Sequence, residues 1–279
     1  MKRILILSLA ILLVMCLGIS PAMAATEGTR VVLGADNTQE QIDTVYSMFE
    51  VNRGDVEELT VTNAEERKYL AGLVPDEKIG NVALSCVYIK TRDTDGISIK
   101  IHNINWVTEE MYRSALATAG ITNAEVSIAA YKPVSGTGAL AGIYKAYEEI
   151  TGVTLSEGAK TVAAEELVVT GELQEVLGDV SSDIINDIKA RLEETKTMSD
   201  NQITVLINET ATKYEVTLTD DQVQQILDLI KKLNASGIDP DTFLKLAEAG
   251  ESAKGFFEKV GDFFKGIGDF FKNLFGGGK

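Results

Sequence analysis

The apolar residues in the first half of the chain follow two spacings in turn, which predicts alternating strands and helices. Residues 29–35 are a short apolar run typical of a strand. In residues 37–49 the apolar side chains recur at helical spacing, and Thr38 with Gln41 forms the capping box that opens a helix. We therefore expect the folded chain to begin with a strand followed by a helix.

Between residues 57 and 131 the same two spacings predict strand, helix, strand, strand, helix and strand. A capping box formed by Thr62 and Glu65 opens the first of these helices. The two middle strands flank residues 93–96 (DTDG), and an Asp-Gly pair between apolar runs is typical of a β-hairpin. This order is the split βαβ pattern of ferredoxin-like sheets. We therefore expect residues 25–133 to form an α+β domain with a small mixed sheet.

Beyond the last predicted strand, the strand signals fade and helical spacing dominates. The clearest apolar stripes lie in residues 179–194, 199–214 and 219–233, and only residues 165–173 are ambiguous. Because each helix has a single apolar stripe, the helices must pack on one another or on the sheet. We therefore predict a second, helical domain over residues 134–250, arranged as a bundle.

The chain begins with a pattern typical of a secretory signal peptide over residues 1–24. Lys2 and Arg3 precede an uncharged apolar run, and residues 22–24 (AMA) have the small-x-small arrangement that signal peptidase reads. The run is shorter than the roughly 20 apolar residues of a membrane-spanning helix. We therefore expect a secreted protein that is extracellular or associated with the cell envelope.

The end of the chain, residues 251–279, holds seven of the nine Phe residues, in pairs that repeat every seven positions. On a helix the apolar residues of this segment share an arc of about 140°, opposite most of the charged side chains. The candidate membrane-binding face consists of Phe256, Phe257, Val260, Phe263, Phe264, Ile267, Phe270, Phe271, Leu274 and Phe275. Such faces, with basic residues nearby, are typical of helices that bind a membrane surface reversibly. Two other partners for this face stay open, the helical domain and a second copy of the chain.

The composition excludes nucleic acid as a partner and a disulfide as a source of stability. The chain has 42 acidic and 26 basic residues, with a formal net charge of −16, whereas nucleic acid is bound by Lys and Arg that neutralise phosphates. Removal of the signal peptide leaves Cys86 as the only cysteine, so no intramolecular disulfide can form. Cys86 has apolar neighbours, and we expect a buried, unreactive thiol.

No residue pattern in the chain predicts a catalytic or metal site. The single histidine, His102, alternates with Ile residues in a predicted strand, so we expect it on the solvent face. No nucleophile elbow or pair of metal ligands accompanies it. A hydrolase with two catalytic carboxylates needs no histidine, but nothing selects such a pair among 42 acidic residues. We therefore predict no catalytic residue, no metal and no cofactor.

Gly136, Gly138 and Gly142 lie between a predicted strand and a predicted helix, where phosphate-binding loops occur. Their spacing is not the GxGxxG of dinucleotide-binding loops, and no Lys-Ser or Lys-Thr pair follows as in a Walker loop. We therefore interpret the segment as a tight linker between the two domains that leads into the N-terminus of a helix.

Four segments of the chain carry a resemblance to a known family. They are LGAD near the start of the mature chain and, within residues 103–152, VTEEMYRSAL, TAGI and VSGTGALAGIYKAYEEITG. Together they resemble the YpuA-like family of predicted secreted proteins from Gram-positive bacteria, over about residues 32–250. Since that family is a domain of unknown function, the resemblance implies no catalytic or binding residue. It singles out a motif of unknown role, Val134, Ser135, Gly136 and Thr137.

These observations predict a secreted, non-enzymatic protein of the cell envelope whose C-terminal amphipathic helix binds a membrane surface. Two alternatives belong to other functional classes. One is a secreted hydrolase that acts on cell-wall polymers through carboxylates, and the other is an assembly protein that self-associates through the Phe-rich tail. The sequence indicates no particular protein partner.

Overall fold

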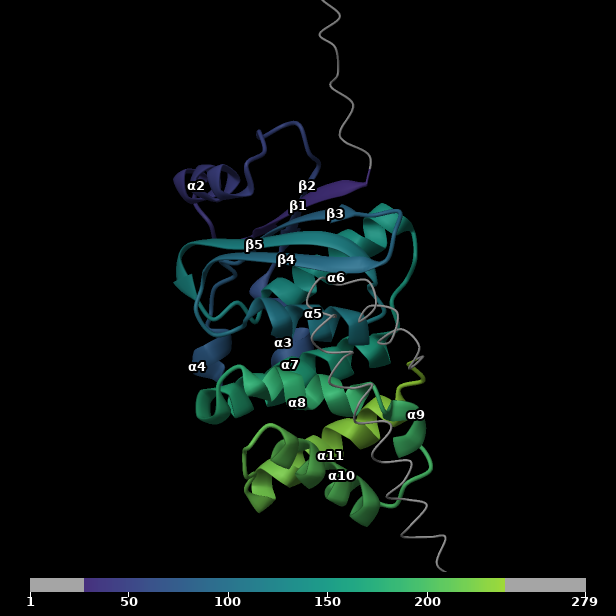
Figure 1. The fold of residues 1–279 in the computed structure, drawn as a ribbon. Coiled ribbons are helices and arrows are strands. Elements are labelled where there is room, and N and C mark those ends of the chain that lie inside the picture. The colour runs from purple at the N-terminus through teal and green to yellow at the C-terminus, as the bar shows by residue number, and fades with distance from the viewer. Residues whose placement is uncertain (1–27, 239–279) are drawn as a thin grey trace, which may run out of the picture.

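A computed structural model describes residues 28–238, in which strands and helices alternate at first and helices follow (Figure 1). The strands are β1 (Thr29–Gly34), β2 (Glu58–Val61), β3 (Cys86–Thr91), β4 (Gly96–Ile104) and β5 (Asn123–Val134). The helices up to the end of β5 are α2 (Gln39–Phe49), α3 (Asn63–Leu70), α4 (Asp76–Ile79) and α5 (Glu109–Thr118). The later helices are α6 (Ala139–Thr151), α7 (Glu157–Leu177), α8 (Val180–Lys189), α9 (Leu192–Thr195), α10 (Asp200–Lys213) and α11 (Asp220–Ala235).

The five strands form one mixed sheet in which β3 separates two parallel pairs. β1 and β2 pair in parallel and are joined through α2, and β4 and β5 pair in parallel and are joined through α5. β3 is antiparallel to both β1 and β5, which gives the strand order β2-β1-β3-β5-β4. The mixed α+β architecture is thus confirmed. The ferredoxin-like order was wrong, because no strand is inserted between the members of either parallel pair.

The predicted hairpin between β3 and β4 was also wrong, because β5 lies between these strands. The backbone N–H of Arg92 donates to the carbonyl of Asn123 at 3.0 Å, and that of Gly96 donates to the carbonyl of Thr122 at 2.7 Å. Both ends of the turn are therefore bonded to the start of β5. β5 is the longest strand, with residues such as Ile128 and Ala129 fully buried on opposite faces, and such a strand gains most from a central position.

One face of the sheet is covered by α2, which encloses a small core of its own (Figure 1). Its members include Val31 and Leu33 from β1 and Phe49 from α2. Cys86 also belongs to this core and is fully buried, and burial raises the pKa of its thiol to about 11. The prediction that this thiol is buried is confirmed, and its lack of reactivity stays a prediction.

The opposite face of the sheet carries a much larger core that continues into the later helices. α6 packs on β1 and β3, and α5 packs on β4. α7 and α8 form the next layer, and α10 and α11 lie farthest from the sheet (Figure 1). Gly142 allows the close approach of α6, because a Cβ there would lie 3.2 Å from Cγ1 of Val32. One hydrophobic cluster runs from the sheet to α11, so the later helices share a core with the sheet.

The local signals for helices are confirmed where they were strongest. The predicted capping boxes at Thr38 and Thr62 open α2 and α3, and boxes of the same kind at Ser199 and Thr219 open α10 and α11. The ambiguous residues 165–173 lie within α7, which contacts α5, α8 and α11. Because α7 is buried on several sides, its sequence has no single apolar stripe.

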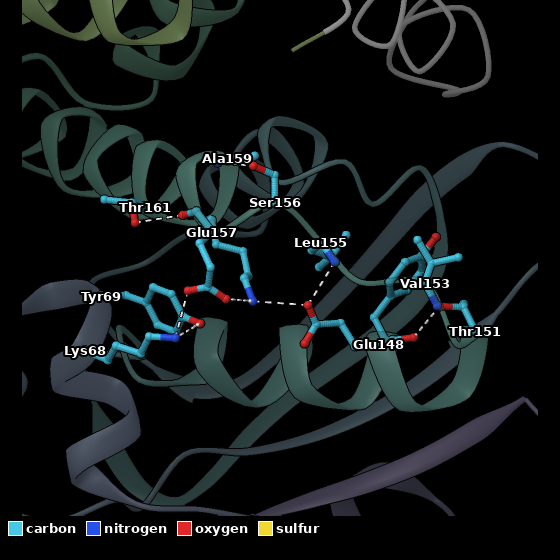
Figure 2. A network of polar contacts seen from close by, with 12 residues as sticks. Lys68, Tyr69, Glu148, Thr151, Val153, Leu155, Ser156, Glu157, Ala159 and Thr161 are labelled. Carbon is cyan, nitrogen blue, oxygen red and sulfur yellow. Dashed lines mark hydrogen bonds and ion pairs between the residues drawn. The ribbon is translucent and has the colours of Figure 1, made fainter. Parts of the chain in front are cut away.

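A network of charged groups ties the turn between α6 and α7 to α3 (Figure 2). The ammonium of Lys160, only 3% exposed, lies 3.1 Å from Oε1 of Glu148 and 2.5 Å from Oε1 of Glu157. Glu157 also pairs with Lys68 of α3 at 2.7 Å, and Glu148 accepts a hydrogen bond from the backbone N–H of Leu155 at 2.9 Å. The network therefore fixes the start of α7 relative to α3 and α6.

Candidate functional site

A cavity of about 500 Å³ lies at the edge of the sheet where β1, β2, β4 and β5 end. Ligand sites of small molecules are typically of this size and, in sheets with parallel strands, lie beyond their carboxyl ends. The polar side chains that line it belong to Glu66, Lys78, Ser85, Asn105, Ser135 and Thr137. Apolar side chains complete the lining, among them Ile79, Val82, Leu84 and Val134.

The motif at residues 134–137 forms the loop from β5 to α6 and one wall of the cavity. The backbone N–H of Val107 donates to the carbonyl of Ser135 at 3.0 Å. Gly136 has φ of +91°, and its carbonyl accepts a hydrogen bond from the buried hydroxyl of Tyr112. A Cβ at Gly136 would overlap this hydroxyl and the side chain of Ile104, so only glycine fits both the backbone and the space.

The two hydroxyl groups of the motif belong to residues that line the cavity, and they lie close to each other. The hydroxyl of Ser135 donates to the carbonyl of Lys78 at 2.9 Å, and it lies 3.3 Å from the hydroxyl of Thr137. Both residues line the cavity. The motif therefore supplies two hydroxyl-bearing residues to the cavity lining.

Glu66 of α3 is the most unusual group at this site. Its side chain lines the cavity although the residue is only 3% exposed. Oε2 accepts a hydrogen bond from Nδ2 of Asn63 at 3.1 Å. Burial raises the pKa of this carboxyl to about 7, with the charge of Asp36 adding to the shift and the bond from Asn63 opposing it. Near neutral pH the group is thus poised between its two protonation states.

The carboxyl group of Glu66 lies against the N-terminus of α6. Gly138, the N-cap residue, has no side chain to cap the helix, and a Cβ there would overlap the Glu66 carboxyl. Backbone N–H groups and the helix dipole make this end of a helix attractive to negative charge. Glu66 already occupies the position that an anion would otherwise take.

On another wall of the cavity, a lysine, a tryptophan and a glutamate form a compact group. The ammonium of Lys78 lies 4.3 Å from the centre of the Trp106 ring and pairs with Glu175 of α7. Nε1 of Trp106 donates to Oε1 of Glu175 at 2.8 Å. The bonds from Lys78 and Trp106 lower the pKa of the Glu175 carboxyl. The positive charge of Lys78 is therefore balanced within the protein.

The segment that follows β1 holds the remaining wall in place. Oδ2 of Asp36 accepts a hydrogen bond from the backbone N–H of Ala83 at 2.7 Å, and Nδ2 of Asn37 donates to the carbonyl of Leu84 at 3.1 Å. A Cβ at Gly34 would overlap the carbonyl of Ala83, so the two segments touch through their backbones. The segment LGAD, which ends at Asp36, thus supports the residues just before β3 that line the cavity.

The structure brings together two of the segments singled out from the sequence. The motif at residues 134–137 lines the cavity or backs its wall, and LGAD supports the wall opposite. His102 is half-buried on β4 and does not line this cavity. The segment around Gly136 and Gly138 leads into the N-terminus of α6, as predicted. The candidate membrane-binding face, Phe256 to Phe275, lies outside the described residues.

Sequence reasoning missed three residues of the site, Glu66, Lys78 and Trp106. Glu66 is one of 42 acidic residues, and nothing near it in the chain marks it as buried. Trp106 offered a usable signal, because it is the single tryptophan of the chain and lies two residues after the end of β4. A lone tryptophan next to a polar residue at the end of a strand is a reasonable mark of a site.

Among the described lining residues, Glu66 is the only one that carries a carboxyl group, whereas glycoside hydrolysis commonly uses two. Within residues 28–238, no cluster of three His, Cys, Asp or Glu side chains could hold a metal ion. Over the same range, no helix is both long enough and apolar enough to cross a bilayer.

Comparisons with known proteins agree on one family. The family described as "Protein of unknown function (DUF1002)" matches residues 33–249. The "Uncharacterized protein YpuA" of Bacillus subtilis (strain 168) is 36% identical over 279 aligned residues, which cover 94% of this chain and 95% of the relative. No solved structure matches the chain. The match to most of the chain and the similarity to this relative show that the protein belongs to the DUF1002 family.

Proposed function

We propose that the protein is a secreted, non-enzymatic component of the cell envelope that binds a small ligand in the cavity described above. In this proposal, residues 1–24 direct secretion and the C-terminal segment binds a membrane surface reversibly. The ligand-binding body then acts close to that surface. The observation that carries the proposal is the cavity itself, in which segments distant in the sequence meet around a buried carboxyl group.

A folded protein does not leave a carboxyl group poorly paired in its interior without a cost to stability. Glu66 has only the neutral amide of Asn63 as a hydrogen-bonding partner among the described residues. Groups whose pKa is displaced in this way cluster at functional sites, because the ligand or substrate completes their interactions. The same cavity is lined by hydroxyl and apolar groups, as expected of a site that orients a small molecule.

The proposed membrane-binding face is Phe256 to Phe275, which lies outside the described residues. Two observations on the described part support a partner elsewhere for this face. The apolar stripe of α11 already packs against α7 and α10. The large apolar residues exposed in the described part are four scattered valines, Val82, Val153, Val176 and Val205. We find there no broad apolar surface on which seven Phe side chains could dock.

The membrane proposal is tested by co-sedimentation with anionic and zwitterionic vesicles. The mature protein should bind, and a version that ends at Ser252 should not. A full-length variant with Phe263→Ser and Phe270→Ser should lose binding, because these positions lie on the apolar face. The matched control, Asp262→Ser with Asp269→Ser, changes the opposite side of the same helix and should still bind.

Absence of binding by the full-length protein would reject the membrane proposal. If the truncated version also unfolded at a lower temperature, the tail would instead be part of the folded body. Concentration-dependent sedimentation that disappears on truncation would favour the assembly protein.

The hydrolase is the second candidate, and the buried carboxyl of Glu66 is the observation that favours it. It requires a second carboxylate, which the described lining does not supply. Release of soluble fragments from cell-wall material by the protein, but not by a Glu66→Gln variant, would establish it. Equal release by both proteins would exclude Glu66 as the catalytic group.

A further inference from the structure

The charges around the cavity favour a cationic ligand. Among the described lining residues, Lys78 is the one cation and Glu66 the one anion. Lys78 is neutralised by Glu175, so its charge is not available to Glu66. The lining together with Glu175 therefore carries one net negative charge when Glu66 is ionised.

The charged groups that face Glu66 from neighbouring elements do not supply a counter-ion. Asp36, which follows β1, adds negative potential, as does Glu65 of α3. Arg67 of the same helix favours the ionised form, but its guanidinium is bonded to Asp76 at 2.7 Å and to the carbonyl of Gly80 at 2.7 Å. Tyr112 of α5 is fully buried, and burial raises its pKa, so it stays neutral. Lys78 of α4 is held by Glu175.

The same geometry disfavours an anionic ligand. The uncapped N-terminus of α6 would attract a phosphate or carboxylate. The carboxyl group of Glu66 is in contact with that terminus at Gly138, so an incoming anion would meet a like charge there. A ligand with a positive group reverses this relation, because it pairs with Glu66 directly.

We propose that the cavity binds a small organic cation, a primary ammonium on a short aliphatic stem, with Glu66 as its counter-ion. The hydroxyls of Ser135 and Thr137 would accept further hydrogen bonds from the ammonium or pair with a polar group on the stem. The stem would lie against apolar lining residues such as Ile79 and Leu84. This inference rests on the ligand-binding function proposed above and names the class of ligand.

The test uses three probes of equal length that differ only at one end. They are 6-amino-1-hexanol, 1,6-hexanediol and 6-hydroxyhexanoate, which are cationic, neutral and anionic at neutral pH. Trp106 lines the cavity and is the only tryptophan of the chain, so its fluorescence reports occupancy of this site. Titrations are carried out on the mature full-length protein at pH 6 and at pH 8.5.

The amino probe should bind at least tenfold more tightly than the other two at pH 8.5. Its affinity should fall about tenfold at pH 6, because a cation selects the ionised form of a carboxyl group that titrates near pH 7. A Glu66→Gln variant should lose both the preference and the pH dependence. Glu65→Gln is the matched control: it changes a neighbouring carboxyl on the same helix, keeps a residue that supports the capping box, and should bind as the parent does.

The possible outcomes distinguish failure of the ammonium inference from failure of the ligand-binding function. Tighter binding of the diol or the hydroxy acid than of the amine would overturn the ammonium inference and leave a ligand-binding cavity in place. A fluorescence response that is the same in the Glu66→Gln variant would also overturn it. If no probe changes the fluorescence of Trp106 up to millimolar concentration, both the inference and the ligand-binding function fail. Thermal unfolding of each variant verifies that it is folded.

Discussion

Two buried glutamates of this protein differ in what surrounds them. Glu166 of α7 is 1% exposed, and Oε1 lies 2.7 Å from the ammonium of Lys189 on α8, which is equally buried. The hydroxyls of Ser114 and Thr118 also donate to the carboxylate of Glu166. Glu66 is 3% exposed, yet its hydrogen-bonding partner is a neutral amide and its side chain lines a cavity.

The charge of Glu166 is compensated by Lys189 within the fold, whereas the carboxyl group of Glu66 belongs to the lining of a cavity. In the interior, burial lowers the pKa of the Lys189 ammonium, and the Glu166 carboxylate opposes that shift. Removal of either partner would leave an uncompensated charge, which is why such pairs are kept together. At the cavity, burial raises the pKa of Glu66, and no cation among the described residues forms an ion pair with it.

The largest loss of stability is expected when the buried pair of Glu166 and Lys189 is broken. Lys189→Met should lower the free energy of unfolding by about 3–5 kcal/mol, because it leaves the Glu166 carboxylate buried without a cation. Urea unfolding of the parent protein and of the variant measures this difference. Lys231→Met, which removes an exposed pair with Asp200, should change the free energy of unfolding far less than Lys189→Met does.

A double variant sharpens this first test. Glu166→Leu combined with Lys189→Met should recover most of the lost stability, because both buried charges are then removed. If Lys189→Met alone were as stable as the parent, the pair would contribute nothing to the fold. The contrast between the two glutamates would then have no energetic basis.

A smaller change in stability is expected when Glu66 is replaced, and this replacement should stabilise the protein rather than destabilise it. Because the pKa of Glu66 is raised in the folded state, the protonated carboxyl favours folding below about pH 4.5, and this contribution is lost as the pH rises to about 7. Glu66→Gln should therefore become more stable relative to the parent by up to about 3 kcal/mol over that range. Thermal and urea unfolding at pH 4.5, 6 and 8 measure the difference.

The neighbouring variant Glu65→Gln provides the control for this pH dependence. The pKa of Glu65 is lowered rather than raised; burial opposes that shift, while Lys145 and the backbone of Thr62 bond to its carboxylate. Its contribution is therefore present above pH 4.5 and should not change between pH 6 and pH 8. If the free energy of unfolding changed with pH in the same way for the parent and for Glu66→Gln, the Glu66 carboxyl would not have a raised pKa.

The smallest change in stability is expected when the Glu66 carboxyl is displaced but the residue is kept. Gly138→Ala should cost about 1–2 kcal/mol, because the new methyl group overlaps the Glu66 carboxyl and displaces it from Asn63. Gly158→Ala is the control within a helix, where the nearest atom to a Cβ, apart from the helix backbone, would be the Ser156 hydroxyl oxygen at 3.7 Å. That substitution should be neutral or slightly stabilising, and equal losses for both variants would refute a specific contact at Gly138.

The sequence predicted what depends on residues close together in the chain. The capping boxes at Thr38 and Thr62 each join residues three positions apart, so their formation depends little on the rest of the fold. The turn at residues 93–96 was also a local signal, but the pairing of its strands was decided by β5. Strand neighbours depend on burial of distant segments, which local spacing does not contain.

The site was predictable only in part, for the same reason. The motif at residues 134–137 was found through a family resemblance, and the structure places it at a cavity. Glu66 comes from a helix about 70 residues earlier in the chain, and its burial follows from the contact with Gly138. Its altered pKa is thus a property of the folded state, and a list of 42 acidic residues cannot reveal it.

The small core beneath α2 has a consequence for the kinetics of local opening. Cys86 lies in this core, fully buried between the sheet and α2, with Nδ2 of Asn37 3.6 Å from its sulfur. A thiol reagent can react there only while α2 is lifted from the sheet, since α2 is the helix that covers this face. The rate of labelling at Cys86 therefore reports how often one layer of the molecule opens while the large core on the other face stays closed. Among the described residues, Cys86 is the only cysteine and so a built-in probe of that motion.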